Sequence, residues 1–188
     1  MATSEAVLAF WLEELDQTQW YKQDDRVDAA IRDRFRETWD AAARGALDDW
    51  RLTARGTLAL LLVLDQFPRN MFRGDPRSFA TDRRALAVAQ HAIAQDLDLL
   101  VPEPERQFFY LPFMHSESLT MQERGVRLIM LRMSEGDNLL HARAHRAVIR
   151  QFGRFPYRND ALSRGSTPAE RAYIAAGGYG HTVNALSA

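Results

Sequence analysis

The stretch "LALLLVLDQFPRN", residues 58–70, decides the fold class of this chain. Its first seven residues are all apolar, and Val63 is the only β-branched residue among them. A segment made of Leu and Ala favours a helix over a strand, and a helix that is apolar on every side is buried on every side. We therefore predict that Leu58–Leu64 forms the most buried helix of an all-α protein.

The rest of the chain repeats apolar residues at helical spacing. Val27, Ile31 and Phe35 recur every four residues, and a later "TPAE" has the pattern of a capping box at the start of a helix. Nothing reads as a sheet, and no low-complexity linker divides the chain. These patterns predict seven or eight helices in an antiparallel array. We expect one helical domain over residues 1–176 and a mobile, glycine-rich tail over residues 177–188.

The composition excludes several classes of protein. The formal net charge of −1 at pH 7 argues against a general affinity for nucleic acid or for an anionic membrane. The sequence has no cysteine, which excludes disulfides, thiolate chemistry and cysteine-based zinc sites. The longest apolar run is too short to span a bilayer, and the N-terminal stretch lacks the basic region of a signal peptide. We expect a cytoplasmic protein with no nucleic-acid or membrane partner.

A second stretch, "IRQFGRFPYRN" at residues 149–159, repeats the order Phe-Pro and then Arg-Asn. We interpret Pro68 and Pro156 as residues that end a helix, because proline lacks the N–H group and clashes with the preceding turn. We interpret Asn70 and Asn159 as helix caps more than as ligand contacts, since asparagine tolerates the left-handed conformation. The neighbouring arginines either pair with carboxylates or face a ligand, and the sequence leaves both readings open.

Polar side chains gather in three places, each at a helix end or just after a proline. Helix ends leave backbone groups without partners and are common places for ligands. If these ends meet, four arginines would converge with carboxylates and two histidines, and such a density of charge is costly to bury for stability alone. The candidate ligand-binding residues are Asp65, Gln66, Arg69, Asn70, Arg73, Asp82, Ser116, Arg154, Arg158 and Asn159.

The candidate proton-transfer residues are His115, Glu117 and His145. His115 and Glu117 are two residues apart and cannot share a helix face. We therefore expect the helix to end between Pro112 and Ser118, which would let the two side chains converge. Glu117 would then orient or charge His115, since histidine is the residue most easily tuned to neutral pH. For His145, a buried structural role is the competing interpretation.

A metal site is the less favoured reading of the histidines. His141 and His145 are four residues apart on one helix face, a spacing that can chelate a metal. No carboxylate accompanies them in the manner of an HExxH motif. We expect no metal and no cofactor.

Four motifs in order, "LDQFPRNMFRG", "FATD", "FFYLPFMHSE" and "HRAVIRQFGRFPYRN", resemble the bacterial family DUF924 over nearly the whole chain. The resemblance implies a tetratricopeptide-like helical fold and carries no established activity. It also implies that the candidate residues named above fall on motif positions, whereas His141 does not. The chain departs from the family at "LSRGST", where Gly165 stands in place of a glutamate.

Three hypotheses about function follow from these observations. The first is an enzyme or binder for a small anionic metabolite, which arginines would clamp while His115 and Glu117 move protons. The second is a peptide-binding or scaffold module, because tetratricopeptide-like arrays often bind peptides on a concave surface. The third is a charge network that only stabilises the fold. The sequence indicates neither the reaction nor the oligomeric state.

Overall fold

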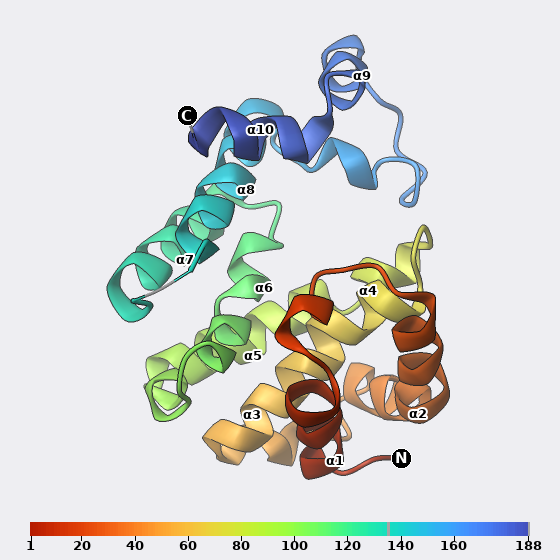
Figure 1. The fold of residues 1–188 in the computed structure, drawn as a ribbon, viewed down its shortest axis with the longest axis vertical. Coiled ribbons are helices and arrows are strands. Elements are labelled where there is room, and N and C mark those ends of the chain that lie inside the picture. The colour runs from red at the N-terminus through yellow and green to blue at the C-terminus, as the bar shows by residue number, and fades with distance from the viewer. Residues whose placement is uncertain (135, 188) are drawn as a thin grey trace. The chain divides into compact units, whose positions relative to one another are not determined.

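The structure is a computed structural model that describes residues 1–134 and 136–187, and it is helical throughout (Figure 1). Over these residues there is no strand, and the continuous helical runs form nine helices, eight of them long. The all-α prediction is confirmed. Where we expected one domain, contacts group the residues into two compact units: a first unit, Met1–Phe109, and a second unit, Tyr110–Ala188. The tetratricopeptide-like arrangement fits this helical content and stays a prediction in its detail.

The first unit is built from five α-helices, two of which run on into π-helical turns. Short 3₁₀ turns connect the helices. The α-helices are α1 (Ser4–Ala9), α2 (Asp25–Ala43), α3 (Ala54–Leu61), α4 (Phe67–Met71) and α5 (Asp82–Ala94), and the π turns span Phe10–Glu14 and Leu62–Gln66. The 3₁₀ turns span Gln17–Gln19, Asp48–Leu52, Pro76–Phe79, Leu97–Leu100 and Glu105–Phe109.

Pro68 does not end a helix, so that interpretation was wrong. α3 runs through the π turn directly into α4, and Pro68 lies inside this continuous helical segment. Proline cannot donate to the carbonyl four residues earlier, which belongs to Leu64. The hydroxyl of Thr81 donates to that carbonyl instead, at 2.5 Å. A side chain from the start of the next helix therefore replaces the bond that proline removes.

The apolar stretch forms the centre of the first unit, as predicted. No residue of Leu58–Leu64 is more than 2% exposed. Phe67, directly after the π turn, is fully buried and packs against other aromatic rings: its ring centroid lies 4.9 Å from that of Phe35 and 5.6 Å from that of Trp11. The burial of these large side chains holds the α3–α4 rod in place and with it the polar residues at its end.

The second unit contains α6 (Leu111–Met114), α7 (Leu119–Arg132), α8 (Asn138–Phe152), α9 (Pro168–Ala175) and α10 (Gly178–Ser187). Helices α7 and α8 form the largest helix pair of this unit (Figure 1). α7 also packs closely on α6, because Gly125 has no side chain: a Cβ atom there would lie 2.9 Å from the Cβ of Phe113. α8 ends at Phe152 with Gly153 in the left-handed conformation, so this helix ends before Pro156 rather than at it.

The C-terminal residues form a helix where we expected a mobile tail. α10 packs along α8, and the ring of Tyr179 stacks on that of His141 with centroids 6.0 Å apart. The glycines just before it serve the turn instead: Gly177 and Gly178 have φ angles of +105° and +56°, which side chains rarely adopt. None of the described helices is both long and apolar enough to cross a bilayer.

Candidate functional site

In the first unit, the arginines at the end of α4 are held by carboxylates. Arg69 donates to the carboxylate of Asp82 at 2.9 Å, and its guanidinium also lies 3.4 Å from the carboxylate of Asp65. Asp65 is almost fully buried, and Gln66 donates to its carboxylate. Asp82 is the first residue of α5, where a negative charge is favourable. These bonds tie the end of the α3–α4 rod to the start of α5.

A buried aspartate that the sequence analysis missed organises the remaining candidates of this unit. Asp28 on α2 accepts a hydrogen bond from Asn70 at 2.7 Å and two from the guanidinium of Arg73, one of them at 2.9 Å. Asn70 lies inside α4, so the interpretation of Asn70 as a cap was wrong. A signal was present: Asp28 shares the helix face of Ile31 and Phe35, which is the buried face of α2.

In the second unit, the chain breaks its helix where we predicted. α6 ends at Met114 and α7 begins at Leu119. The side-chain amide of Gln122 donates both its hydrogens to the loop between them, to the carbonyl of Met114 at 2.6 Å and to that of Ser116 at 2.7 Å. These carbonyls flank His115, so Gln122 fixes the backbone that presents the histidine.

Glu117 is bound by an arginine that the sequence analysis did not select. The guanidinium of Arg164 donates to its two carboxylate oxygens at 2.7 and 2.9 Å, and the backbone N–H of Phe155 donates at 2.8 Å. Burial alone would raise the pKa of Glu117, but these donors and the charge of Arg158 hold that pKa below its usual range. The proposed role of Glu117 in charging His115 is untested and stays a prediction.

Two other candidates also have partners within the second unit. Arg154 donates to both carboxylate oxygens of Glu170, at 2.6 and 2.8 Å, and Glu170 completes the predicted capping box of α9. Asn159 is fully buried; its amide donates to Ser166, and its amide oxygen accepts from Arg164. Asn159 is the C-cap of the 3₁₀ turn Pro156–Arg158, as interpreted, but its φ angle of −59° is right-handed rather than left-handed.

Two histidines and a tyrosine of the second unit form a connected group, which we call the histidine–tyrosine group: His141 and His145 on α8, and Tyr179 on α10. Nδ1 of His145 lies 2.9 Å from the backbone carbonyl of His141. A carbonyl only accepts, so Nδ1 of His145 carries its proton and Nε2 is the basic nitrogen. The hydroxyl oxygen of Tyr179 lies 3.1 Å from this Nδ1 and 2.8 Å from Nδ1 of His141.

His145 lies close to another histidine and to an arginine. Its ring centroid lies 6.1 Å from that of His115, and its edge meets the ring of Phe155, over which the guanidinium of Arg158 is placed at 4.5 Å. Burial lowers the pKa of His145 to about 3, and the nearby His115 and Arg158 lower it further. His145 is therefore neutral in the folded protein near pH 7.

The candidate site residues form two groups, one in the first unit and one in the second. The expectation that the two groups meet concerns both units together and stays a prediction. Over residues 1–134 and 136–187, no cluster of three or more His, Asp or Glu side chains has the arrangement of a metal site.

The fold and these residues define an all-helical protein whose polar side chains are organised by arginine–carboxylate pairs and by a histidine–tyrosine group. The chain belongs to the family described as bacterial protein of unknown function (DUF924), which matches residues 7–178. This confirms the resemblance seen in the motifs.

One solved structure, of a protein of unknown function from Agrobacterium tumefaciens, is similar to this chain. It is 43% identical, with a TM-score of 0.86, and the match covers 91% of this chain and 96% of that one. No curated protein matches the chain.

Proposed function

We propose that this protein binds a small anionic metabolite beside His145 and that His145 accepts a proton from it. The observation that carries the proposal is the hydrogen bond from Nδ1 of His145 to the carbonyl of His141, which leaves Nε2 as the base. The charges of His115 and Arg158, which lower the pKa of His145, would be offset by a bound anion. An anion therefore relieves the repulsion that a proton on His145 would otherwise meet.

The histidine–tyrosine group supplies a route for the proton. When Nε2 of His145 takes a proton from the ligand, Nδ1 passes its own proton to the hydroxyl oxygen of Tyr179. Tyr179 gives its hydroxyl proton to Nδ1 of His141 at the same time. The ligand loses one proton, His145 and Tyr179 stay neutral, and His141 gains the charge. This transfer avoids a charged His145, which burial disfavours.

A ligand screen followed by histidine NMR tests the proposal. Anions that bind only the folded state raise the melting temperature, so carboxylate and phosphate metabolites are screened by thermal shift. For each anion that does so, the ring nitrogen signals of His141 and His145 are compared with and without it. We expect the His141 signals to move towards those of a protonated ring while the His145 ring stays neutral, because His141 gains the charge in the proposed transfer.

Matched variants decide where the anion binds. His145→Asn keeps a donor near the Nδ1 position and removes the base, and we expect it to abolish the thermal response. His91→Asn is the control, since His91 is exposed on α5 in the first unit. A screen in which every stabilising anion acts on His145→Asn as strongly as on the unaltered protein would show that none of them binds beside His145 and would remove the support for the proposal.

A further inference from the structure

We propose that two adjoining cavities of the second unit form one binding site for an aromatic carboxylate. This inference goes beyond the proton transfer at His145 and does not depend on it. The first cavity, of about 500 Å³, is lined by Tyr157, Ile174, Gly177, Gly178 and Tyr179. The second, of about 600 Å³, shares Tyr157 and Ile174 with the first. Both volumes lie in the range of small-molecule sites, about 300–1,000 Å³.

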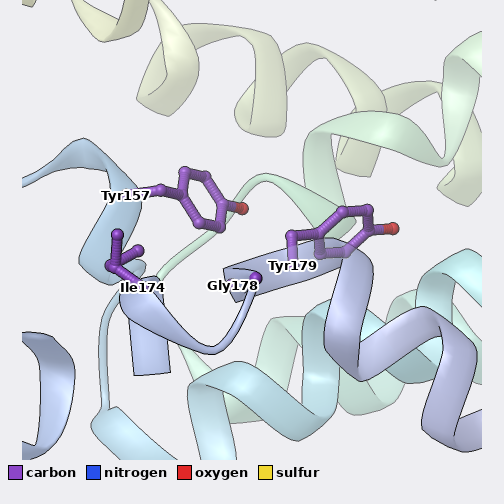
Figure 2. A pocket seen from close by; sticks show the side chains of 5 residues that line it. Tyr157, Ile174, Gly178 and Tyr179 are labelled. Carbon is purple, nitrogen blue, oxygen red and sulfur yellow. The ribbon is translucent and has the colours of Figure 1, made fainter. Parts of the chain in front are cut away.

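The first cavity suits a flat apolar group. The rings of Tyr157 and Tyr179 form an aromatic wall, with centroids 6.4 Å apart and planes inclined by 69° (Figure 2). Ile174 lies beside Tyr157 (Figure 2), and both side chains are more than 40% exposed although they are large and apolar. Exposed apolar side chains that gather around a cavity favour an apolar occupant. An aromatic ring fits best, because it can pack edge-to-face or stacked on tyrosine.

The floor of this cavity is kept open by the turn between α9 and α10. Gly177 and Gly178 line it, and their positive φ angles exclude ordinary side chains there. A ligand ring can therefore approach the backbone itself. The hydroxyl of Tyr179 is hydrogen-bonded to His141, so the ring of Tyr179 is held in place before a ligand binds.

The second cavity supplies the charge that a carboxylate needs. It is lined by two arginines, Arg164 and Arg171, against a single aspartate, Asp160. Arg164 is engaged with Glu117, which leaves Arg171 on α9 as the main anion donor. Arg171 donates one N–H group to the carbonyl of Ser166, and this bond orients the guanidinium while using one of its five donors.

The two cavities together select one class of ligand. A single guanidinium fork matches the two oxygens of a carboxylate, and the shared wall of Tyr157 and Ile174 joins the anionic end to the aromatic end. A ligand with a carboxylate but no ring makes no contact with the two tyrosines. A ligand with a ring but no carboxylate makes no hydrogen bonds to Arg171. The occupant is therefore an arylacetate-like molecule, with a ring and a carboxylate separated by a short linker.

Titration with a matched set of probes tests this inference. Indole-3-acetate and phenylacetate are compared with indole and with acetate at constant ionic strength, by following the amide signals of Gly178 and Tyr179 in the whole protein. We expect the aromatic carboxylates to bind at least about tenfold more tightly than indole or acetate, since each alone makes only half of the contacts. Equal affinity for acetate and both aromatic carboxylates, or no binding by either aromatic carboxylate, would overturn the proposal.

Substitutions on α9 distinguish the contribution of the carboxylate contact from that of the ring contact. Arg171→Gln should weaken indole-3-acetate about tenfold while leaving the affinity for indole unchanged, because only the charged contact is lost. Ile174→Ser should weaken both. Arg143→Gln, an exposed arginine of α8, is the control and should change neither. An Arg171→Gln variant that binds indole-3-acetate as tightly as the unaltered protein would refute the role of the second cavity.

A further variant keeps this inference distinct from the proposed proton transfer. His145→Asn should bind indole-3-acetate within about twofold of the unaltered protein, because His145 lines neither cavity. Loss of indole-3-acetate binding in His145→Asn, with the fold intact by circular dichroism, would contradict the separate site. The anion screen tests the proton transfer at His145, and the probe titration tests the aromatic carboxylate site, so a negative result in one experiment does not affect the other.

Discussion

The carboxylate of Glu117 and the guanidinium of Arg164 form two parallel hydrogen bonds, at 2.7 and 2.9 Å, across 47 residues of the chain. The pair fastens the loop after α6 to the segment that precedes α9. Both side chains are less than one-third exposed, so the pair is better shielded from water than the surface ion pairs of this protein. The loop that carries His115 is therefore held by an ion pair at one end and by Gln122 within it.

Replacing Arg164 with Gln should destabilise the protein by roughly 1–3 kcal/mol, because Glu117 keeps its charge in a half-buried position and loses two charge-assisted hydrogen bonds. Urea unfolding followed by circular dichroism measures the change. The control is Arg55→Gln, which breaks an exposed pair with Glu5 and should cost less than about 1 kcal/mol. Equal effects of the two substitutions would show that the Glu117 pair is no stronger than a surface pair.

Replacing Asp28 with Ala should destabilise the protein more than most substitutions in α2, by roughly 2–4 kcal/mol. Asn70 and Arg73 would lose a buried charged acceptor that both of them use. Thermal and urea unfolding measure the change. Asp33→Ala, an exposed position on the same helix, is the matched control and should be within about 0.5 kcal/mol of the unaltered protein.

Acid should destabilise the protein through His145. Its pKa falls from 6.5 to about 3 on folding, so between these values the unfolded chain binds more protons there than the folded protein. Stability from this group is fully present above about pH 6.5 and is lost as the pH falls towards 3. The charged and titratable groups that face His145 are His115, His141, Arg158 and Tyr179.

The measurement is the unfolding free energy of the unaltered protein and of His145→Asn at a series of pH values between 7 and 4, which lie within the window set by the pKa values of His145. The difference between the two proteins should shift in favour of the variant as the pH falls. A difference that is constant over this range would contradict a lowered pKa. Carboxylates titrate in both proteins, so their contribution cancels in the difference.

Replacing Tyr179 with Phe should interrupt the route from His145 to His141 and leave α10 in place. The ring is retained, whereas the hydroxyl that lies between the two Nδ1 atoms is lost. We expect the ring nitrogen signals of His141 to change, since its Nδ1 loses a donor, while the Nδ1–H of His145 keeps its bond to the carbonyl. Unchanged His141 signals would contradict the assigned hydrogen bond.

The sequence was most informative where a pattern is local. The apolar stretch at residues 58–64, the capping box of Thr167 and Glu170 and the break after α6 each depend on neighbouring residues, and each was predicted correctly. The path of the chain past Pro68 was not predicted, because the donor that replaces the proline N–H group belongs to Thr81, the residue before α5. A side chain 13 residues further along the chain therefore lets the helix continue past the proline.

The partners of the candidate site residues were the least predictable part. The role of Glu117 beside His115 stays a prediction, whereas the ion pair of its carboxylate with Arg164 was missed because the two residues are far apart in the sequence. Asp28 was overlooked although its helix position placed it among buried residues. The C-terminal helix was missed because its pattern is weak, and it is tied to α8 by the single hydroxyl of Tyr179 and by ring stacking.

The π turn at Leu62–Gln66 has a consequence for how this protein can change by insertion and deletion. A π turn contains one residue more than the α-helical turn that it replaces. Removing one residue there would restore a regular helix, because the N–H group of Phe67 already donates to the carbonyl of Leu62, which would then lie four residues earlier. Phe67 would keep its place in the aromatic core and Arg69 its place beside Asp82, since the π turn absorbs the extra residue. A deletion in the α-helical part of α3 would instead rotate all that follows by about 100°, so the π turn is the part of this rod that can lose a residue without displacing its polar end.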